Sequence, residues 1–189
     1  MKALTPDEVL KVLKVASNES KRNAAMILLA FRHGMRASEV CNLRLSDVDL
    51  KTGEITIRRL KGSLKTTQPL VDLAGQPLLS EKRVLRAWLD ERRDSSDYLF
   101  VSQKGGRLDR SAFFRVFQAA AQQAGLPTDK CHPHSLKHAL GFALVAANVN
   151  LAIVKQALGH RSIASTAVYT TPTDEQAGKA VTIALAGLF

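Results

Sequence analysis

"LGHRSIASTAVYT", residues 158–170, contains one of the two tyrosines in this chain of 189 residues. Tyr169 stands nine residues after His160, at the end of a run of small and polar residues, and Pro172 follows shortly after it. In a folded domain a tyrosine is usually a half-buried aromatic whose hydroxyl has a partner. The stretch therefore raises the question of what a tyrosine does at the end of such a run, and the rest of the chain has to answer it.

The chain is strongly basic. It has 27 Lys and Arg against 17 Asp and Glu, a net charge of +10. Such an excess favours polyanionic partners, above all nucleic acid, because each neutralised phosphate releases counterions. The stretch from Lys51 to Lys65 is especially basic, since its five Lys and Arg residues accompany a single acid, Glu54. A charge run is often only a solvated surface, but an excess of this size predicts nucleic-acid binding.

Targeting signals and cysteines indicate the cellular compartment in which the protein is expected. No apolar run approaches the length of a membrane span, and the amphipathic start "MKALTPDEVLKVL" lacks the features of a signal peptide. Two cysteines, Cys41 and Cys131, are too few for a disulfide framework, which fits a reducing compartment. We therefore predict a cytoplasmic protein without a membrane partner.

Most of the chain has helical patterning. Thr5 and Glu8 predict a capping box at the start of a first helix, and Gly34 ends a second, strongly apolar one. Between residues 46 and 73 the runs "SDVDL", "EITIRRL" and "TTQPLVDL" predict a small antiparallel sheet instead. Helices are expected over residues 4–17, 20–34, 37–45, 79–93, 108–125, 133–149, 150–160 and 173–189. The expected fold class is α+β, mainly α: a helical bundle with a small antiparallel three-stranded sheet.

Four short stretches carry reactive or phosphate-binding side chains. They are "GMRASEV" with Arg36, "LKGSLK" with Lys61, "PHSLKHAL" with His134, Lys137 and His138, and the opening stretch with His160 and Tyr169. Each alone is ordinary, but their order resembles the tyrosine recombinases, the phage integrase family. Catalytic domains of that family carry an arginine in "G-L-R-x-S-E" and a hairpin lysine in "K-G-x-x-K". An "H-x-L-R-H" box, an "L-G-H" box and a tyrosine nine residues after the last histidine follow. The resemblance covers about residues 4–173.

The chemistry of that family explains these residue types. Displacing a DNA 5′-oxygen from phosphorus without a metal requires a nucleophile, cations that neutralise the non-bridging oxygens, and an acid for the leaving group. The resemblance implies that Tyr169 is the nucleophile and forms a 3′-phosphotyrosine. It implies further roles: Arg36, Lys137 and His160 hold the phosphate, His134 assists proton transfer, and Lys61 is the general acid. No metal or other cofactor is expected.

The resemblance also implies partners and a domain organisation. Double-stranded DNA is the expected partner, with a homo-tetramer that synapses two DNA sites. Residues 1–172 would form the catalytic domain, and residues 173–189 a C-terminal helix that docks on a neighbouring protomer or packs on its own domain. Because the chain starts at "MKALTPDEV", where such a catalytic domain begins, no N-terminal core-binding domain is expected. The chain is then either a fragment or a naturally short family member.

Two features leave alternatives open. Lys137 stands where the family has its second arginine, which keeps the charge and loses the planar fork. A catalytically weakened DNA-binding regulator of the same fold is therefore the alternative function, and an enzyme like the type IB topoisomerases is a third. Cys131, His132, His134 and His138 invite a structural zinc, but their spacing matches no common zinc framework.

Overall fold

The fold is built around α2 (Lys21–Arg32), in which every residue from 24 to 30 is buried. A helix that is apolar on all sides belongs at the centre of a core. α1 (Pro6–Glu19) packs against α2 as the other arm of a helical hairpin. Ser20 joins the two helices, because it ends α1 and its hydroxyl accepts a hydrogen bond from the amide of Asn23 in the first turn of α2.

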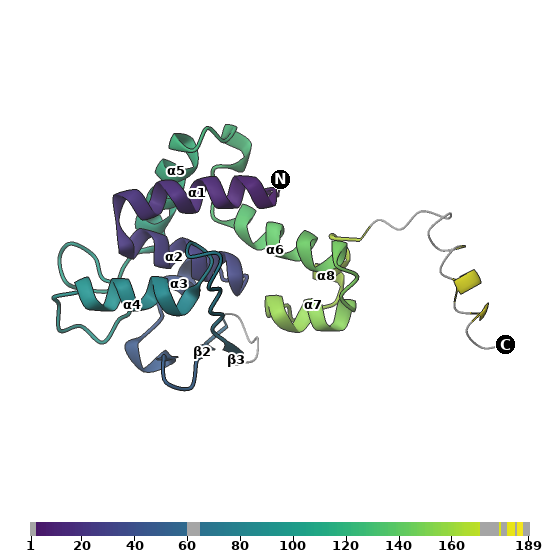
Figure 1. The fold of residues 1–189 in the computed structure, drawn as a ribbon, viewed down its shortest axis with the longest axis horizontal. Helices are drawn as coiled ribbons and strands as arrows, with labels where there is room; N and C mark the ends of the chain where they lie inside the picture. Colours follow the sequence, from purple (N-terminus) through teal and green to yellow (C-terminus); the bar gives the residue numbers. More distant parts are fainter. Residues whose placement is uncertain (1–2, 60–64, 171–177, 179–180, 184, 187–189) are drawn as a thin grey trace.

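The structure is a computed structural model that describes residues 3–59, 65–170, 178, 181–183 and 185–186. The elements after α2 are α3 (Ala37–Cys41), the 3₁₀ turn η1 (Leu45–Asp47), β1 (Val48–Asp49), β2 (Glu54–Ile57), β3 (Thr66–Pro69), α4 (Glu81–Glu91), α5 (Arg110–Gln123), the 3₁₀ turn η2 (Thr128–Lys130), α6 (His134–Ala146), α7 (Leu151–Leu158) and α8 (Ala164–Ala167). Helices α1 to α5 surround one core, and the small sheet lies beside it (Figure 1).

The sheet is antiparallel in the order β1-β2-β3. Ile55 and Ile57 on β2 are fully buried, while Glu54 is exposed, as the alternation of side chains along a strand requires. On the other face, the Oγ1 atoms of Thr56 and Thr67 lie 3.1 Å apart. The connection between β2 and β3 contains residues 60–64, which lie outside the described part of the chain.

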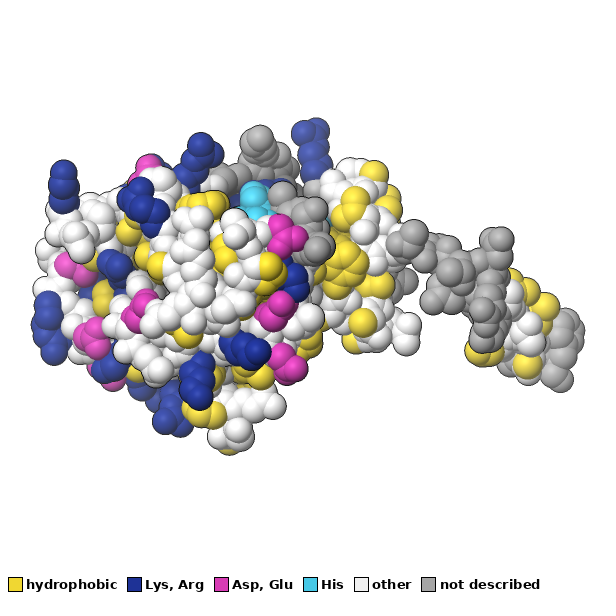
Figure 2. All heavy atoms as spheres, turned by 90° about the horizontal axis from the view of Figure 1, so that it is seen from above, with side chains coloured by type: hydrophobic (Ala, Val, Ile, Leu, Met, Phe, Trp, Pro, Cys, Tyr) yellow, Lys and Arg dark blue, Asp and Glu magenta, His cyan; other side chains and the backbone are white. Residues whose placement is uncertain are grey.

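α6 connects the main core to a second, smaller cluster. Its first half contributes to the main core, and the helix packs against both α2 and α7. The smaller cluster consists of buried Val154, Leu158 and Tyr169, against which Leu140 and Leu144 of α6 pack with Val145 and Val149. Helices α6, α7 and α8 lie to one side of the main body in Figure 1. On the face that Figure 2 shows, hydrophobic side chains gather on that part, whereas Lys and Arg are spread over the main body.

The predicted fold class is confirmed, with its helices and its three-stranded antiparallel sheet. The capping box of Thr5 and Glu8 is present, since each donates its amide to the side chain of the other. Three boundaries in and next to the sheet differ by three residues or more. The helix expected over 37–45 ends at Cys41, because Asp47 accepts the amide of Arg44 and starts a 3₁₀ turn. The strand expected over 66–73 ends at Pro69, which has no amide to donate. The strand expected over 54–60 ends at Ile57.

Two further expectations concern the C-terminal part. α8 was not predicted, and it turns the segment before Tyr169 into a short helix. Most of the helix expected over 173–189 lies outside the described residues. Those that are described, 178, 181–183 and 185–186, have helical conformation and lie apart from the body (Figure 1). In the described part of the chain, no helix has the length and apolar character needed to cross a membrane.

Candidate active site

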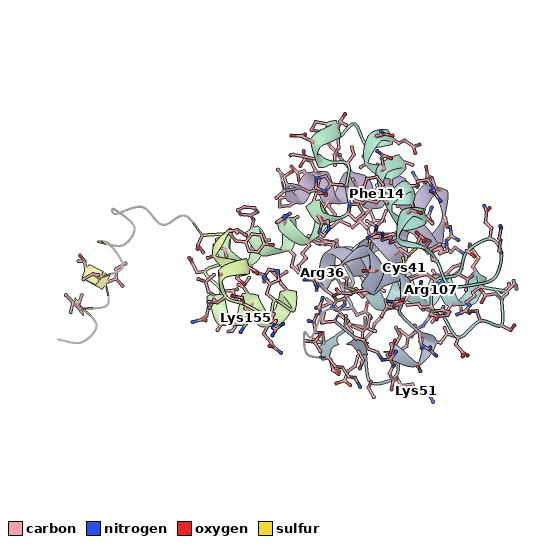
Figure 3. The ribbon with its side chains drawn as sticks, turned by 180° about the vertical axis from the view of Figure 1, so that it is seen from behind. Arg36, Cys41, Lys51, Arg107, Phe114 and Lys155 are labelled. Atoms are coloured by element: carbon pink, nitrogen blue, oxygen red, sulfur yellow. The ribbon has the colours of Figure 1, made fainter. Side chains whose placement is uncertain are left out.

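Arg36 lies at the junction between α2 and α3. Gly34, with a φ of +54°, turns the chain out of α2 in a conformation that favours glycine. The main-chain N–H of Arg36 donates to Glu39 Oε2 at 2.9 Å, and its Nη1 donates to Glu39 Oε1 at 2.9 Å. The Glu39 side chain is fully buried, whereas 33% of the Arg36 side chain is exposed. Glu39 therefore fixes Arg36 while part of the arginine side chain stays accessible. Figure 3 shows Arg36 at the edge of the main body that faces α7 and its Lys155.

Lys137 lies on the first turns of α6 and is only 5% exposed. Its Nζ donates to the main-chain carbonyl of Leu158, the last residue of α7, at 2.6 Å. Burial lowers the pKa of Lys137 to about 7; the positive charge of Arg36 adds to this shift, and the carboxylate of Glu39 opposes it. An ammonium has three N–H donors, and this bond uses one of them. Lys137 thus holds the end of α7 with one N–H group, and while the ammonium is charged its other two N–H groups can bind a phosphate oxygen.

His160 follows Gly159, whose φ of +61° ends α7. The Nδ1 of His160 and the Oγ1 of Thr166 lie 3.0 Å apart, so the first turn after α7 is tied to α8. Burial lowers the pKa of His160 to about 4, and the positive charges of Lys137 and Arg36 add to this shift. Near neutral pH the ring is therefore uncharged. It can exchange hydrogen bonds with a phosphate and does not add a further cation.

The ring of Tyr169 is packed into the smaller cluster, and the residue is only 5% exposed. The ring meets His138 and Phe142 edge-on, at centroid distances of 5.7 and 5.2 Å, and lies nearly parallel to His160 at 6.2 Å. It covers Gly141, where an added Cβ would be 2.5 Å from the Tyr169 Cζ. Burial raises the pKa of the phenol. In this structure the tyrosine ring is therefore held by its neighbours.

His134 is the first residue of α6. Desolvation lowers the pKa of its ring, and the positive charges of His132, Lys137 and Arg36 act in the same direction. Because these groups influence it electrostatically, His134 belongs to the same basic region as Arg36 and Lys137. A neutral imidazole there is able to accept a proton.

Two residues remain to be considered, the predicted general acid and the second tyrosine of the chain. Lys61, the predicted general acid, is outside the described residues. Tyr98, the second tyrosine, pairs through its backbone with Arg44, whose guanidinium lies 5.3 Å from the centre of its ring. This cation–π contact gives Tyr98 a structural role.

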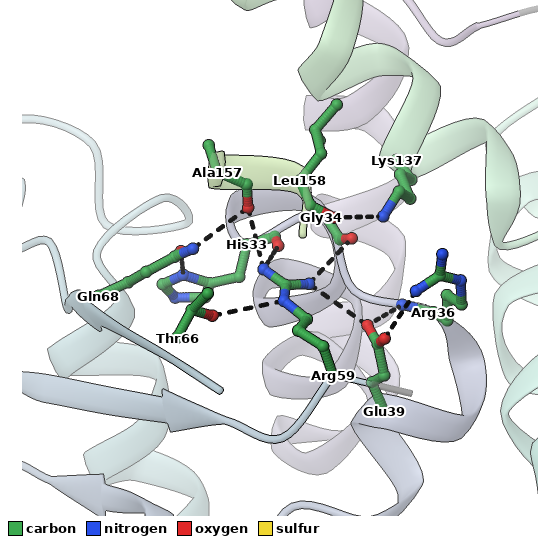
Figure 4. A network of polar contacts seen from close by, with 10 residues as sticks. All are labelled: His33, Gly34, Arg36, Glu39, Arg59, Thr66, Gln68, Lys137, Ala157 and Leu158. Carbon is green, nitrogen blue, oxygen red and sulfur yellow. Dashed lines mark hydrogen bonds and ion pairs between the residues drawn. The ribbon is translucent and has the colours of Figure 1, made fainter. Parts of the chain in front are cut away.

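The described groups form one electrostatic unit. The pKa of His160 is lowered by Lys137, Arg36 and a further cation, Arg59, and the pKa of Lys137 is lowered by the same two arginines. Positive groups from α3, α6 and the stem of the β2–β3 hairpin thus converge near the end of α7 (Figure 4). Placing several positive charges this close together raises the electrostatic free energy of the protein unless an anion is bound between them. The arrangement suits a phosphodiester, with a tyrosine beside it. Among the described residues, no group of three His, Cys, Asp or Glu side chains is placed to hold a metal ion.

Sequence reasoning missed two residues of this unit, Glu39 and Arg59. Glu39 had a usable signal, since it stands three residues after Arg36, the spacing at which a carboxylate reaches back to the amide that precedes a helix. Arg59 had no such signal. It was counted in the basic run expected to face nucleic acid or solvent, and for this residue the expectation is wrong, because its side chain is 0% exposed.

Comparisons with known proteins agree with this geometry. The sequence model of the phage integrase family matches residues 2–176. The chain is 39% identical over 173 residues to the type 1 fimbriae regulatory protein FimB of Escherichia coli strain K12. This alignment covers 88% of this chain and 82% of FimB. It is 32% identical over 183 residues to the tyrosine recombinase XerA of Pyrococcus furiosus. That alignment covers 95% of this chain and 60% of XerA.

Solved structures show the same fold. A crystal structure of XerA recombinase superposes with a TM-score of 0.78 at 29% identity, over 96% of this chain and 64% of that one. A pre-cleavage complex of the site-specific recombinase XerH with its difH substrate has a TM-score of 0.80 at 26% identity, over 97% of this chain and 54% of XerH. The chain therefore spans less than two thirds of the length of these two solved recombinases.

Proposed function

This chain belongs to the phage integrase family, and we propose that it is a site-specific tyrosine recombinase, which cleaves and rejoins DNA strands through a 3′-phosphotyrosine intermediate. The observation that carries the proposal is the convergence of Arg36, Lys137 and His160, with the ring of Tyr169 stacked 6.2 Å from that of His160. A basic pocket alone would fit any DNA-binding protein. A phenol beside a phosphate pocket adds a nucleophile.

In the cleavage step, the phenolic oxygen of Tyr169 attacks the phosphorus of the scissile phosphodiester. The bond from this oxygen to phosphorus forms as the bond to the 5′-oxygen breaks. The phenolic proton passes to a neutral base, for which His134 is the assigned residue, and Lys61 protonates the departing 5′-oxygen. Rejoining is the reverse sequence, with a 5′-hydroxyl as the attacking group. The numbers of protons and electrons balance, so the step needs no co-reactant.

The cations stabilise the extra negative charge on the non-bridging oxygens. Arg36 presents a fork that matches two oxygens, and Glu39 holds this fork in place before DNA binds. Lys137 supplies a point charge, in contrast to the fork of an arginine. Its ammonium is kept beside the site by the carbonyl of Leu158. Because the donors are positioned beforehand, little reorganisation is needed in the transition state.

The proposal includes double-stranded DNA as substrate and a tetramer on two synapsed sites. The described residues of the C-terminal segment, 178, 181–183 and 185–186, lie apart from the body (Figure 1), and among them Val181, Ile183 and Leu185 are 58%, 73% and 51% exposed. An apolar cavity of 310 Å³ lies between the start of α1, Phe31 and Phe142. We assign it as the place where residues 173–189 of a neighbouring protomer dock. Light scattering on DNA-bound protein should then show a tetramer, and removal of residues 173–189 should reduce it to smaller species. The proposal also places the protein in the cytoplasm, where its DNA substrate lies.

A nicked suicide substrate tests the function directly. The short strand that cleavage releases diffuses away, so the covalent protein–DNA adduct accumulates. Peptide mapping of the adduct should identify the Tyr169 peptide, and the Tyr98 peptide should remain unmodified as an internal control. Substrates with one and with two sites then separate recombination from the relaxation of single sites. An absence of adduct with intact DNA binding would overturn the proposal in favour of a DNA-binding regulator.

A further inference from the structure

Arg59 is a buried arginine two residues after β2, and all its hydrogen-bond donors are used. A guanidinium has five N–H donors. Nε donates to Thr66 Oγ1 at 3.4 Å. Nη1 donates to Gly34 O and to Glu39 Oε2, both at 3.3 Å. Nη2 donates to His33 O at 2.8 Å and to Ala157 O at 2.9 Å. The side chain is 0% exposed, so no donor is left for DNA (Figure 4).

The acceptors explain how this charge is tolerated inside the protein. Burial lowers the pKa of Arg59, and the charge of Glu39 opposes that shift. The carbonyls of His33 and Gly34 lie at the C-terminal end of α2, and that of Ala157 lies at the C-terminal end of α7. C-terminal helix ends carry partial negative charge. Two helix ends and one carboxylate therefore surround the guanidinium and offset its desolvation.

The same acceptors lead directly to the assigned phosphate ligands. Gly34 stands two residues before Arg36, and the carboxylate of Glu39 is shared between Arg59 and Arg36. Ala157 stands three residues before His160. Gly159 lies directly over the arginine, because a Cβ at that position would be 2.6 Å from the Arg59 Nε. One planar group thus spans the segment that bears Arg36 and the segment that bears His160.

We propose that Arg59 is a positioning residue for strand cleavage: it sets the distance between Arg36 and His160 without touching DNA. This inference rests on the proposed function. A lysine would retain the charge, but one ammonium cannot bridge the two helix ends in fixed geometry as the fork does. The separation of Arg36 and His160 would then relax. A misplacement on the order of 1 Å in such a site costs about 10²-fold in rate.

The test compares Arg59→Lys with Arg92→Lys. Arg92 is also buried, with a side chain 5% exposed, and its fork binds Asp94 outside the site. We would measure DNA affinity and single-turnover cleavage of the suicide substrate well below the melting temperature of each variant. Arg59→Lys should keep its DNA affinity within about twofold and cleave about 10- to 100-fold more slowly. Arg92→Lys should lose thermal stability while cleaving at the rate of the unmodified protein.

The outcomes separate this inference from the function on which it rests. If the unmodified protein forms no adduct, the proposed function fails. If it does, and folded Arg59→Lys cleaves at the same rate, Arg59 is only a structural residue. Equal losses of affinity and cleavage rate would also overturn the inference, because they indicate a DNA contact.

A second pair of variants decides the matter if Arg59→Lys does not fold. Thr66→Val keeps the shape of a buried side chain and removes the acceptor of the Arg59 Nε. Thr67→Val changes the neighbouring residue, whose hydroxyl instead meets Thr56 on the exposed face. Thr66→Val should slow cleavage about threefold or more at unchanged DNA affinity, and Thr67→Val should not. Equal cleavage rates for the two variants would sink the proposal.

Discussion

The two parts of the molecule that α6 connects are packed very differently. The main core contains the buried faces of α1, α2, α4 and α5 with both isoleucines of β2. Among the described residues, the smaller cluster has three buried side chains, Val154, Leu158 and Tyr169. Local stability follows the number of buried apolar contacts, so the segment with the assigned nucleophile should open at lower free energy than the segment with Arg36. Phosphate ligands need fixed positions, whereas a nucleophile has to form and break a bond to phosphorus.

Two cations join these parts. Arg59 and Lys137 donate to the carbonyls of Ala157 and Leu158, consecutive residues at the end of α7. Both bonds run from the densely packed part to the thinly packed one. Through these bonds α7 is attached to the main core at the point where the assigned site lies, although its own cluster is small.

The largest expected effect is on the nucleophile itself. Tyr169→Phe keeps the ring in its cluster and removes the oxygen assigned to attack phosphorus, so the covalent adduct should be abolished. DNA affinity and thermal stability should stay close to those of the unmodified protein. Tyr98→Phe is the matched control and should form adduct at the normal level. Adduct formation by Tyr169→Phe would show that the nucleophile lies elsewhere.

The next effect concerns Lys137, which joins the two parts. Lys137→Ala removes a donor assigned to the transition state and should slow cleavage by about 10²–10³-fold. Lys137→Arg keeps the charge and should stay within about tenfold of the unmodified protein in single-turnover cleavage. If Lys137→Ala cleaves at the normal rate, Lys137 serves only the carbonyl of Leu158.

The same residue predicts a pH dependence. A lysine is cationic below its pKa, and the pKa of Lys137 is lowered to about 7. Phosphate binding that depends on this charge is therefore present below about pH 7 and declines as the pH rises through that value. A bound phosphate stabilises the ammonium and moves the decline to higher pH. Arginine stays charged throughout, so the rate ratio of Lys137→Arg to the unmodified protein should increase from about pH 6 to about pH 9. A constant ratio would contradict this assignment.

A smaller effect is expected where the Tyr169 ring covers α6. Gly141→Ala places a Cβ 2.5 Å from the Tyr169 Cζ and should displace the ring, at a cost of about 1–3 kcal/mol in stability. Cleavage should slow about tenfold while DNA affinity is unchanged. Gly106→Ala is the control, since a Cβ there meets no atom within 4 Å. A Gly141→Ala variant with normal cleavage would mean that the ring leaves this position before it reacts.

The smallest effect on cleavage should come from truncations that compare the two cores. Leu28→Ala removes a buried side chain of α2 and should lower the global free energy of unfolding by about 2–5 kcal/mol. Val154→Ala in the smaller cluster should cost about 1–2 kcal/mol. Hydrogen exchange should show faster exchange throughout the protein for Leu28→Ala, and mainly over residues 150–169 for Val154→Ala. Loss of protection in α2 on Val154→Ala would mean that the two clusters unfold together.

Much of the fold could be predicted because its signals are local. The capping box at Thr5, the apolar run of α2 and the glycine that ends it depend on residues within a few positions of one another. The order of the motifs was also sufficient to identify the family, because the chemistry needs these residue types in each position. Two of the boundaries that differed, at Cys41 and Pro69, were decided by a bond to Asp47 and by the missing amide of proline.

The sequence by itself determined the fold class, the family and the residues assigned to the reaction, since spacing along the chain is enough to place His160 and Tyr169 near one another. Only the tertiary structure decided how those residues are held. Arg59 reads as one more charge in a basic run, and it is buried because the ends of α2 and α7, more than 120 residues apart in the chain, present their carbonyls to the same point. Likewise, Gly141 matters only because the ring of Tyr169, which follows α8, lies over it. Contacts of this kind depend on which helix ends and faces meet in space, and no local pattern of residues encodes that meeting.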